Sequence, residues 1–224
     1  MTTTRTISLA GARGGHGTTT VAAALALFAA GHRPTALVSS ESTAAAALLG
    51  VPLPMNGDPA QLAPNLVLAA DPTVLSEDSP EIIVVDAGIA CEAAAALVAD
   101  EHYVVLRGPC YVALASLLAA SADRPDGIIL LVEPKRSLTA RDVTDVLDVP
   151  VIATIDVTPD VARTIDAGLL VSRLHRLREC LHISSTYGRG AESATRLTAR
   201  APSASLSLCD NDNSVCVLKG LLSP

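Results

Sequence analysis

The stretch Thr6–Ala30, which reads TISLAGARGGHGTTTVAAALALFAA, decides the fold. Its first residues, Thr6–Ala10, form a short apolar run typical of a buried strand that ends at Gly11. A glycine-rich turn follows, and an alanine-rich segment then predicts a helix over Thr18–Ala30, closed by Gly31. A strand, a glycine loop and a helix start in this order predict a phosphate cradle. Glycines let consecutive backbone N–H groups face one anion, and the helix N-terminus adds partial positive charge.

Apolar runs of strand length alternate with helical segments along the rest of the chain. Further strands are expected at Thr35–Ser39, Leu66–Ala69, Glu81–Val85, His102–Leu106, Gly127–Val132 and Val149–Ile155. Helices are expected at Glu41–Leu49, Ile89–Ala99, Tyr111–Ala122, Leu138–Leu147 and Asp160–Ala167, and a proline-rich loop at Val51–Pro64. Strands that are apolar on both faces and alternate with helices predict an α/β fold. We expect a doubly wound, mostly parallel sheet between two helical layers, a three-layer sandwich.

The domain organisation follows from where this alternation stops. We expect one nucleotide-binding domain over residues 1–180, followed by a low-complexity, poorly ordered tail over residues 181–224, which is rich in Ser, Thr, Arg, Gly and Asn. Residues 1–172 carry 9 basic and 19 acidic side chains, and residues 173–224 carry 7 and 4. The acidic body leaves nucleic-acid binding unsupported, although the weakly basic tail does not exclude it.

Several function classes find no support in the composition. The five cysteines contain no CxxC pair and the five histidines are scattered, so neither a zinc site nor a disulfide framework is indicated. No stretch reaches 18 uninterrupted strongly apolar residues, and the N-terminus lacks the pattern of a signal peptide. We therefore expect a cytoplasmic protein without a membrane helix.

The glycine loop, together with Asp86 at the end of the Glu81–Val85 strand, resembles the ParA/MinD-type P-loop ATPases. That superfamily carries a deviant Walker A motif, KGGxGK[ST]T. The matching positions here are Gly14, Gly15, Gly17, Thr19 and Thr20. Arg13 stands in place of the signature lysine, and Thr18 in place of the P-loop lysine. The resemblance spans about residues 5–172 and is nearest to the TadZ/CpaE-like branch, whose P-loop is degenerate.

The resemblance implies ATP or ADP with Mg²⁺ as the bound group. Its phosphates would be held by the loop, residues Arg13, Gly14, Gly15, His16, Gly17, Thr18, Thr19 and Thr20, and the metal by Thr19 and Asp86. Arg13 would reach the nucleotide of a second subunit, because the family forms a nucleotide-bound sandwich homodimer. The family acts with protein partners in positioning systems such as DNA partitioning, septum placement and pilus localisation.

Departures from the family pattern point to weak or absent ATP hydrolysis. The family places an acidic residue at the end of its second strand, where this chain has Ser39 and Ser40. Glu41 is one step further, where an acidic side chain suits the start of a helix. We therefore assign no catalytic residue. Glu133 lies where the family often reads adenine, but it does not match that pattern and receives no role.

Two alternatives stay open at this point. A nucleotide-free pseudo-ATPase would keep the fold as an interaction scaffold, which the lost lysines favour. An NAD(P)-binding Rossmann domain would also fit a strand, glycine loop and helix. It is disfavoured because Gly15 and Gly17 are followed by Thr20 where the third glycine of GxGxxG belongs.

Overall fold

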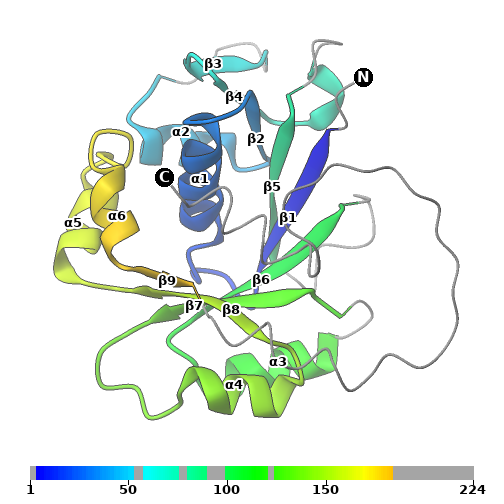
Figure 1. Cartoon of the computed structure of the whole chain (residues 1–224), viewed down its shortest axis with the longest axis vertical. Helices are drawn as coiled ribbons and strands as arrows, with labels where there is room; N and C mark the ends of the chain where they lie inside the picture. Colours follow the sequence, from blue (N-terminus) through cyan, green and yellow to red (C-terminus); the bar gives the residue numbers. More distant parts are fainter. Residues whose placement is uncertain (1–3, 53–57, 76–79, 90–98, 121–123, 184–224) are drawn as a thin grey trace, which may run out of the picture.

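The computed structural model describes residues 4–52, 58–75, 80–89, 99–120 and 124–183. Its strands are β1 (Arg5–Gly11), β2 (Thr35–Ser39), β3 (Ala60–Ala63), β4 (Leu66–Ala69), β5 (Ile82–Ile89), β6 (Glu101–Arg107), β7 (Gly127–Val132), β8 (Val151–Asp156) and β9 (Leu181–Ile183). Its helices are α1 (Thr18–Ala30), α2 (Ser42–Leu49), α3 (Tyr111–Ala120), α4 (Ala140–Leu147), α5 (Pro159–Asp166) and α6 (Leu174–Glu179), with a 3₁₀ turn, η1, at Pro72–Val74. Figure 1 shows these elements in one body.

The strands of the described residues form one sheet in the order β3-β4-β2-β5-β1-β6-β7-β8-β9. Every pairing from β4 to β8 is parallel, and only the edge strands β3 and β9 run antiparallel. The predicted α/β class with a mostly parallel sheet is therefore confirmed. β5 lies between β1 and β2, whereas a Rossmann domain of strand order 3-2-1-4-5-6 places its first two strands side by side. The Rossmann alternative is wrong for this reason.

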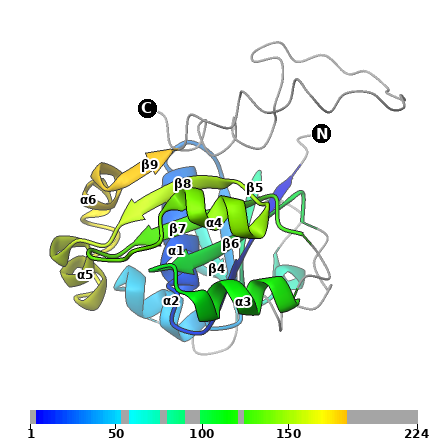
Figure 2. The same ribbon diagram turned by 90° about the horizontal axis from the view of Figure 1, so that it is seen from below.

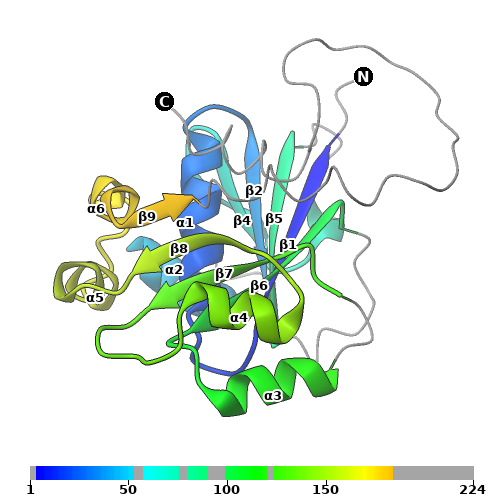
Figure 3. The ribbon, with the colours of Figure 1, turned by 60° about the horizontal axis from the view of Figure 1, so that its bottom comes forward.

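Helices cover both faces of the sheet, as the predicted three-layer sandwich requires. One apolar core packs α1, α2, α5 and α6 against the sheet, and alternate residues such as Val105 and Ile129 point into it. Their neighbours Val104 and Ile128 point to the opposite face, into a second core with α3 and α4. In Figure 3, α3 and α4 lie on one side of the sheet and α1 on the other, and Figure 2 shows the same layers from below.

The elements around the glycine loop were predicted well. The differences lie at strand ends, at the sheet edges and at α6, a helix that the sequence analysis did not predict. The bounds of α1, β2, β4 and β7 agree with the prediction. The expected helix over Ile89–Ala99 falls mostly on residues 90–98, which lie outside the described residues. The prediction of a continuous loop over Val51–Pro64 is wrong at β3, which pairs only with β4. Prolines flank it, as an edge strand permits.

Two further corrections concern β5 and β9. The expected turn at Ala87–Gly88 is wrong, because β5 continues to Ile89 and pairs it with Gly11 of β1. The register shift leaves an extra residue in β5, and Gly88 (φ 73°) provides the positive φ that such a bulge favours. β9 is an edge strand that the sequence analysis did not predict, and its residues 181–183 pair with β8.

Candidate functional site

The glycine loop connects β1 to α1 at the carboxyl edge of the sheet. Gly15 (φ 77°) and Gly17 (φ 82°) both have left-handed backbone conformations, which cost a residue with a Cβ about 1–2 kcal/mol. Gly17 occupies the N-cap position of α1, and no side chain of the described chain caps that helix start. The first turn also carries no acidic residue. Its N–H groups therefore keep the partial positive charge that attracts an anion.

The outer part of the loop faces solvent while both of its ends are fixed. Arg13, Gly14 and Gly15 are exposed, whereas Ala12 is buried and donates its N–H to the Val105 carbonyl at 2.9 Å. At the other end, the Val21 N–H donates to the Gly17 carbonyl at 2.9 Å and begins the hydrogen bonding of α1. The loop is therefore open to a ligand, yet it is held in place by β6 and α1.

Thr18, which replaces the P-loop lysine, has its side chain at the base of the loop. It is 8% exposed, and its Oγ1 lies where a Cβ on Gly11 would overlap it. The side chain therefore packs against the first residue of the turn rather than facing solvent. Thr19 and Thr20 are partly exposed on the first turn of α1, so their hydroxyl groups are more accessible than that of Thr18.

Asp86 lies beside this loop because β5 is the neighbour of β1 and pairs Asp86 with Leu9. Its side chain is buried, with 6% exposed. The Ser39 hydroxyl of β2 donates to Asp86 Oδ2 at 3.0 Å, and the Gly88 N–H lies 3.4 Å from Oδ1. Ser39 therefore holds the Asp86 carboxylate. Sequence reasoning missed this contact, although it expected Ser39 at the end of one strand and Asp86 directly after another.

A Mg²⁺ ion fits the oxygen donors of this edge. Mg²⁺ takes one or two carboxylates together with hydroxyls, waters and phosphate oxygens, and Asp86 and Thr19 supply a carboxylate and a hydroxyl. Within the described residues, no group of three or more His, Cys, Asp or Glu side chains could hold a metal by itself. A metal here would therefore depend on a ligand that brings its own oxygens.

Glu41 lies outside this arrangement. It is exposed and occupies the N-cap position of α2, without a side-chain hydrogen bond to the helix in the described structure. This agrees with its interpretation as a residue of the helix start.

The opposite flank of the loop contains a cluster that sequence reasoning did not assemble. The Arg107 N–H at the end of β6 donates to His16 Nδ1 at 3.4 Å. Arg107 Nε donates to Glu133 Oε1 at 2.9 Å, and Arg136 Nε donates to Oε2 of the same carboxylate at 2.9 Å. Burial lowers the pKa of His16 below its usual 6.5, and the nearby cations Arg13 and Arg107 lower it further. His16 is therefore a neutral acceptor within a positively charged surrounding.

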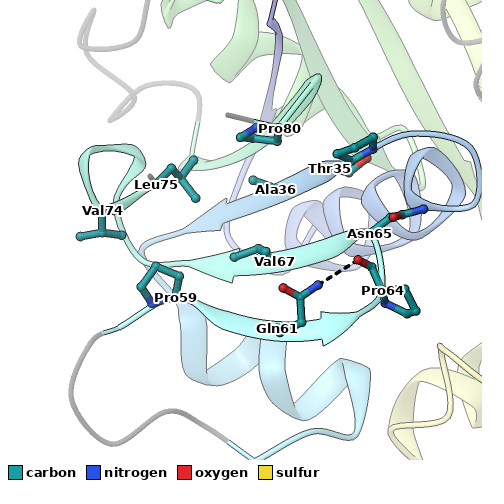
Figure 4. A pocket seen from close by; sticks show the side chains of 11 residues that line it. Thr35, Ala36, Pro59, Gln61, Pro64, Asn65, Val67, Val74, Leu75 and Pro80 are labelled. Atoms are coloured by element: carbon teal, nitrogen blue, oxygen red, sulfur yellow. Dashed lines mark hydrogen bonds between the residues drawn. The ribbon is translucent and has the colours of Figure 1, made fainter. Parts of the chain in front are cut away.

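A hollow of about 560 Å³ lies elsewhere, at the amino end of the sheet (Figure 4). Its lining includes Thr35, Val67 and Pro80, which belong to the start of β2, the face of β4 and the approach to β5. Ligands of open α/β sheets bind outside the carboxyl ends of the strands. We therefore place the candidate site at the glycine loop and not in this hollow.

None of the helices in the described residues has both the length and the hydropathy that a membrane span requires.

Comparison with known proteins agrees with this geometry. No family model and no curated protein sequence matches the chain. Among solved structures, the septum site-determining protein MinD of Pyrococcus horikoshii, complexed with Mg-ADP, has a TM-score of 0.62 at 21% identity, over 77% of this chain and 89% of that one. A ParA family ATPase from Chlorobium tepidum has a TM-score of 0.59 at 16% identity, over 80% and 96%.

A third similar structure is the MinC:MinD cell division protein complex of Aquifex aeolicus. It has a TM-score of 0.57 at 18% identity, over 73% of this chain and 86% of that one. The chain therefore has the fold of the MinD- and ParA-type P-loop ATPases, as its glycine loop predicted.

Proposed function

We propose that this protein binds ATP or ADP with Mg²⁺ at the glycine loop and uses the bound nucleotide as a switch in a positioning or partitioning process. The observation that supports it most is the open loop with two left-handed glycines, which leads into the uncapped start of α1 with Asp86 on the adjacent strand. The similar MinD structure from Pyrococcus horikoshii is described as complexed with Mg-ADP, which supports the same ligand class here.

Different residues of the loop would bind the phosphates and the metal. Backbone N–H groups from Gly15 to Thr19 would surround a phosphate, since the glycines allow its oxygens to come close. The Thr19 hydroxyl and Asp86, which Ser39 holds in place, would bind Mg²⁺. When bound, Mg²⁺ neutralises phosphate charge. Arg13, Gly14 and Thr20 complete the proposed binding set.

We further propose that hydrolysis is weak or absent. Thr18 adds no cation to the site, and its side chain packs against Gly11. Ser39 is not a base that could orient an attacking water, and its hydroxyl already donates to Asp86. Glu41 is on the surface at the start of α2. Thr18 therefore supplies no positive charge for a γ-phosphate, and neither Ser39 nor the surface residue Glu41 is placed to orient an attacking water.

The assembly that fits this proposal is a nucleotide-dependent homodimer in the cytoplasm. The exposed Arg13 would reach the second subunit's nucleotide, as the resemblance implies. The similar MinD from Aquifex aeolicus was solved in a complex with MinC, which supports a protein partner here as well. The likeness to the TadZ/CpaE branch makes pilus localisation one process to test.

Division of the chain into a nucleotide-binding domain over residues 1–180 and a C-terminal tail remains part of the proposal.

A nucleotide-free scaffold is the second candidate. The buried position of the Thr18 side chain favours it, because a site that had kept strong phosphate binding would place a cation there. In this case the same fold would present a surface to partner proteins without a ligand.

Titration calorimetry with ATP, ADP and NAD separates the candidates. We expect heat with Mg-ATP and Mg-ADP, none with NAD, and loss of binding in Gly17→Ala, whose φ of 82° tolerates a Cβ poorly. Gly31→Ala is the matched control, because Gly31 lies at the other end of α1 with φ −63°. Thr18→Lys should tighten ATP binding about ten- to hundredfold. Absence of heat with every nucleotide would leave the scaffold.

A further inference from the structure

Arg107 is fixed beside the glycine loop by its own backbone. It is the last residue of β6, which pairs with β1 along the strand that leads into the loop. Its N–H donates to His16 Nδ1, so the end of β6 and the middle of the loop are joined. A ligand seated on the loop would therefore lie near the end of β6, where Arg107 is.

The guanidinium of Arg107 shares its counter-charge with a second arginine. Arg107 and Arg136 donate to different oxygens of the Glu133 carboxylate, both from Nε at 2.9 Å. Two cations on one anion leave the cluster with a net charge of +1. Hydrogen bonds from Arg136, and then from Arg107, lower the pKa of the Glu133 carboxyl. Arg136 alone can therefore balance the negative charge of Glu133 when the Arg107 guanidinium leaves the carboxylate.

The arrangement also depends on the residue that follows Arg107. A Cβ on Gly108 would lie 2.5 Å from Glu133 Oε2 and 2.9 Å from Arg136 Nε. The carboxylate and the second guanidinium thus pack directly on the Gly108 backbone. Arg107 has 45% of its side chain exposed, against 21% for Glu133, so Arg107 is the freer partner of the pair.

Arg13 and Arg107 are both close enough to His16 to act on it. Burial is the main cause of the lowered pKa of His16; the two cations lower it further, and a hydrogen bond to the Val105 backbone and the Glu133 carboxylate act in the opposite direction. Thr18 contributes no charge to this region, and its side chain lies at the base of the loop. The cationic groups are therefore on the flanks of the loop and not at the position of the P-loop lysine.

We propose that Arg107 makes the charge-assisted phosphate contact that Thr18 cannot make. This inference rests on the proposed nucleotide binding. When a nucleotide binds, the Arg107 guanidinium leaves Glu133 Oε1 and donates to phosphate oxygens, to which its planar fork is suited. Arg136 stays on Glu133 and neutralises it. Before a ligand binds, the Glu133 carboxylate therefore competes with phosphate for the Arg107 guanidinium.

Calorimetric titration of Mg-ATP, Mg-ADP and adenosine into four proteins tests the proposal: wild type, Arg107→Ala, Glu133→Gln and Arg141→Ala. Arg107→Ala should weaken ATP and ADP binding about tenfold or more, as expected for one charge-assisted contact, without changing the affinity for adenosine. Glu133→Gln should tighten ATP binding, because Arg107 then loses its competing partner. Arg141→Ala is the control, since that arginine also pairs with a carboxylate but is 90% exposed on α4.

The outcomes separate this inference from the proposed function. ATP binding by Arg107→Ala within about twofold of wild type would overturn the role of Arg107 and leave nucleotide binding intact. Failure of wild type to bind any nucleotide would overturn both. Should Arg107→Ala not fold, Glu133→Gln decides, and an unchanged or weaker ATP affinity in that variant would refute the proposal.

Discussion

The contact between Gly11 and Thr18 yields a prediction about how the base of the loop is built. In the variant Gly11→Ala, the new Cβ would overlap Thr18 Oγ1, well inside the 3.0 Å that real Cβ contacts respect. Thr18 cannot move freely, since it is 8% exposed and a β-branched side chain has few rotamers in a helix. We expect Gly11→Ala to lower the free energy of unfolding by about 1–3 kcal/mol, the usual cost of overpacking.

The same overlap should disappear when Thr18 is shortened. The next atoms that the Gly11 Cβ meets are the Arg13 carbonyl oxygen at 3.1 Å and the Gly88 carbonyl oxygen at 3.4 Å, which require only small adjustments. In a Thr18→Ala background, Gly11→Ala should therefore cost about 0.5 kcal/mol. The double-mutant cycle then gives a coupling energy of about 0.5–2.5 kcal/mol, in the range seen for residues in contact.

Urea unfolding followed by circular dichroism measures the four free energies of the cycle. Gly14→Ala is the control, because a Cβ there meets only Ile89 Cδ1, at 3.7 Å. It should change stability by about 0.5 kcal/mol or less. Effects of Gly11→Ala and Thr18→Ala that add within about 0.5 kcal/mol would show that Thr18 does not pack against Gly11. The account of why Thr18 is withdrawn from the phosphate site would then fail.

Three more predictions concern other contacts. Glu101→Ala should lower the free energy of unfolding by about 2–3 kcal/mol in urea melts, because it leaves the partly buried Arg5 without its carboxylate partner. Glu81→Ala, which removes an exposed ion pair, should cost about 0–1 kcal/mol. Equal losses in the two variants would contradict the prediction. Because the pKa of His16 is lowered in the folded chain, the unfolded chain binds the proton first as pH falls, and stability present above pH 6.5 is lost below it. His16→Asn should reduce this loss in melts at pH 7.5 and 5.5. An unchanged loss would mean that the partly buried His16 does not cause it. Thr139→Ala removes half of the capping box of α4 and should cost about 1 kcal/mol in thermal melts, whereas no loss would mean that the box adds nothing.

Local signals were sufficient for the elements that surround the loop. Gly17 and Gly31 delimit α1 as predicted, since a glycine before the first turn and another after the last are strong boundary signals. The apolar runs of β2, β4 and β7 were equally clear, because strands buried on both faces carry no polar alternation that could confuse their limits.

Several of the errors are found where pairing with another strand decides the structure. β3 is a strand only because it pairs with β4 at the sheet edge, and its flanking prolines indicated a loop. β9 is a strand because it pairs with β8, and the last residues of β5 are extended because Ile89 pairs with Gly11. Short edge strands and bulges have weak local preferences, so their backbone hydrogen bonds and not their composition define them.

The amino-acid sequence alone determined the strand, glycine loop and helix start, the α/β class and the loss of both lysines. These depend on residue type and on spacing within a few turns of chain. Only the tertiary structure placed β5 between β1 and β2, which brings Ser39 to Asp86, and set Arg107, His16 and Glu133 together on the flank of the loop. Such contacts join residues 47, 91 and 26 positions apart, and their geometry arises from strand order, to which no local sequence pattern corresponds.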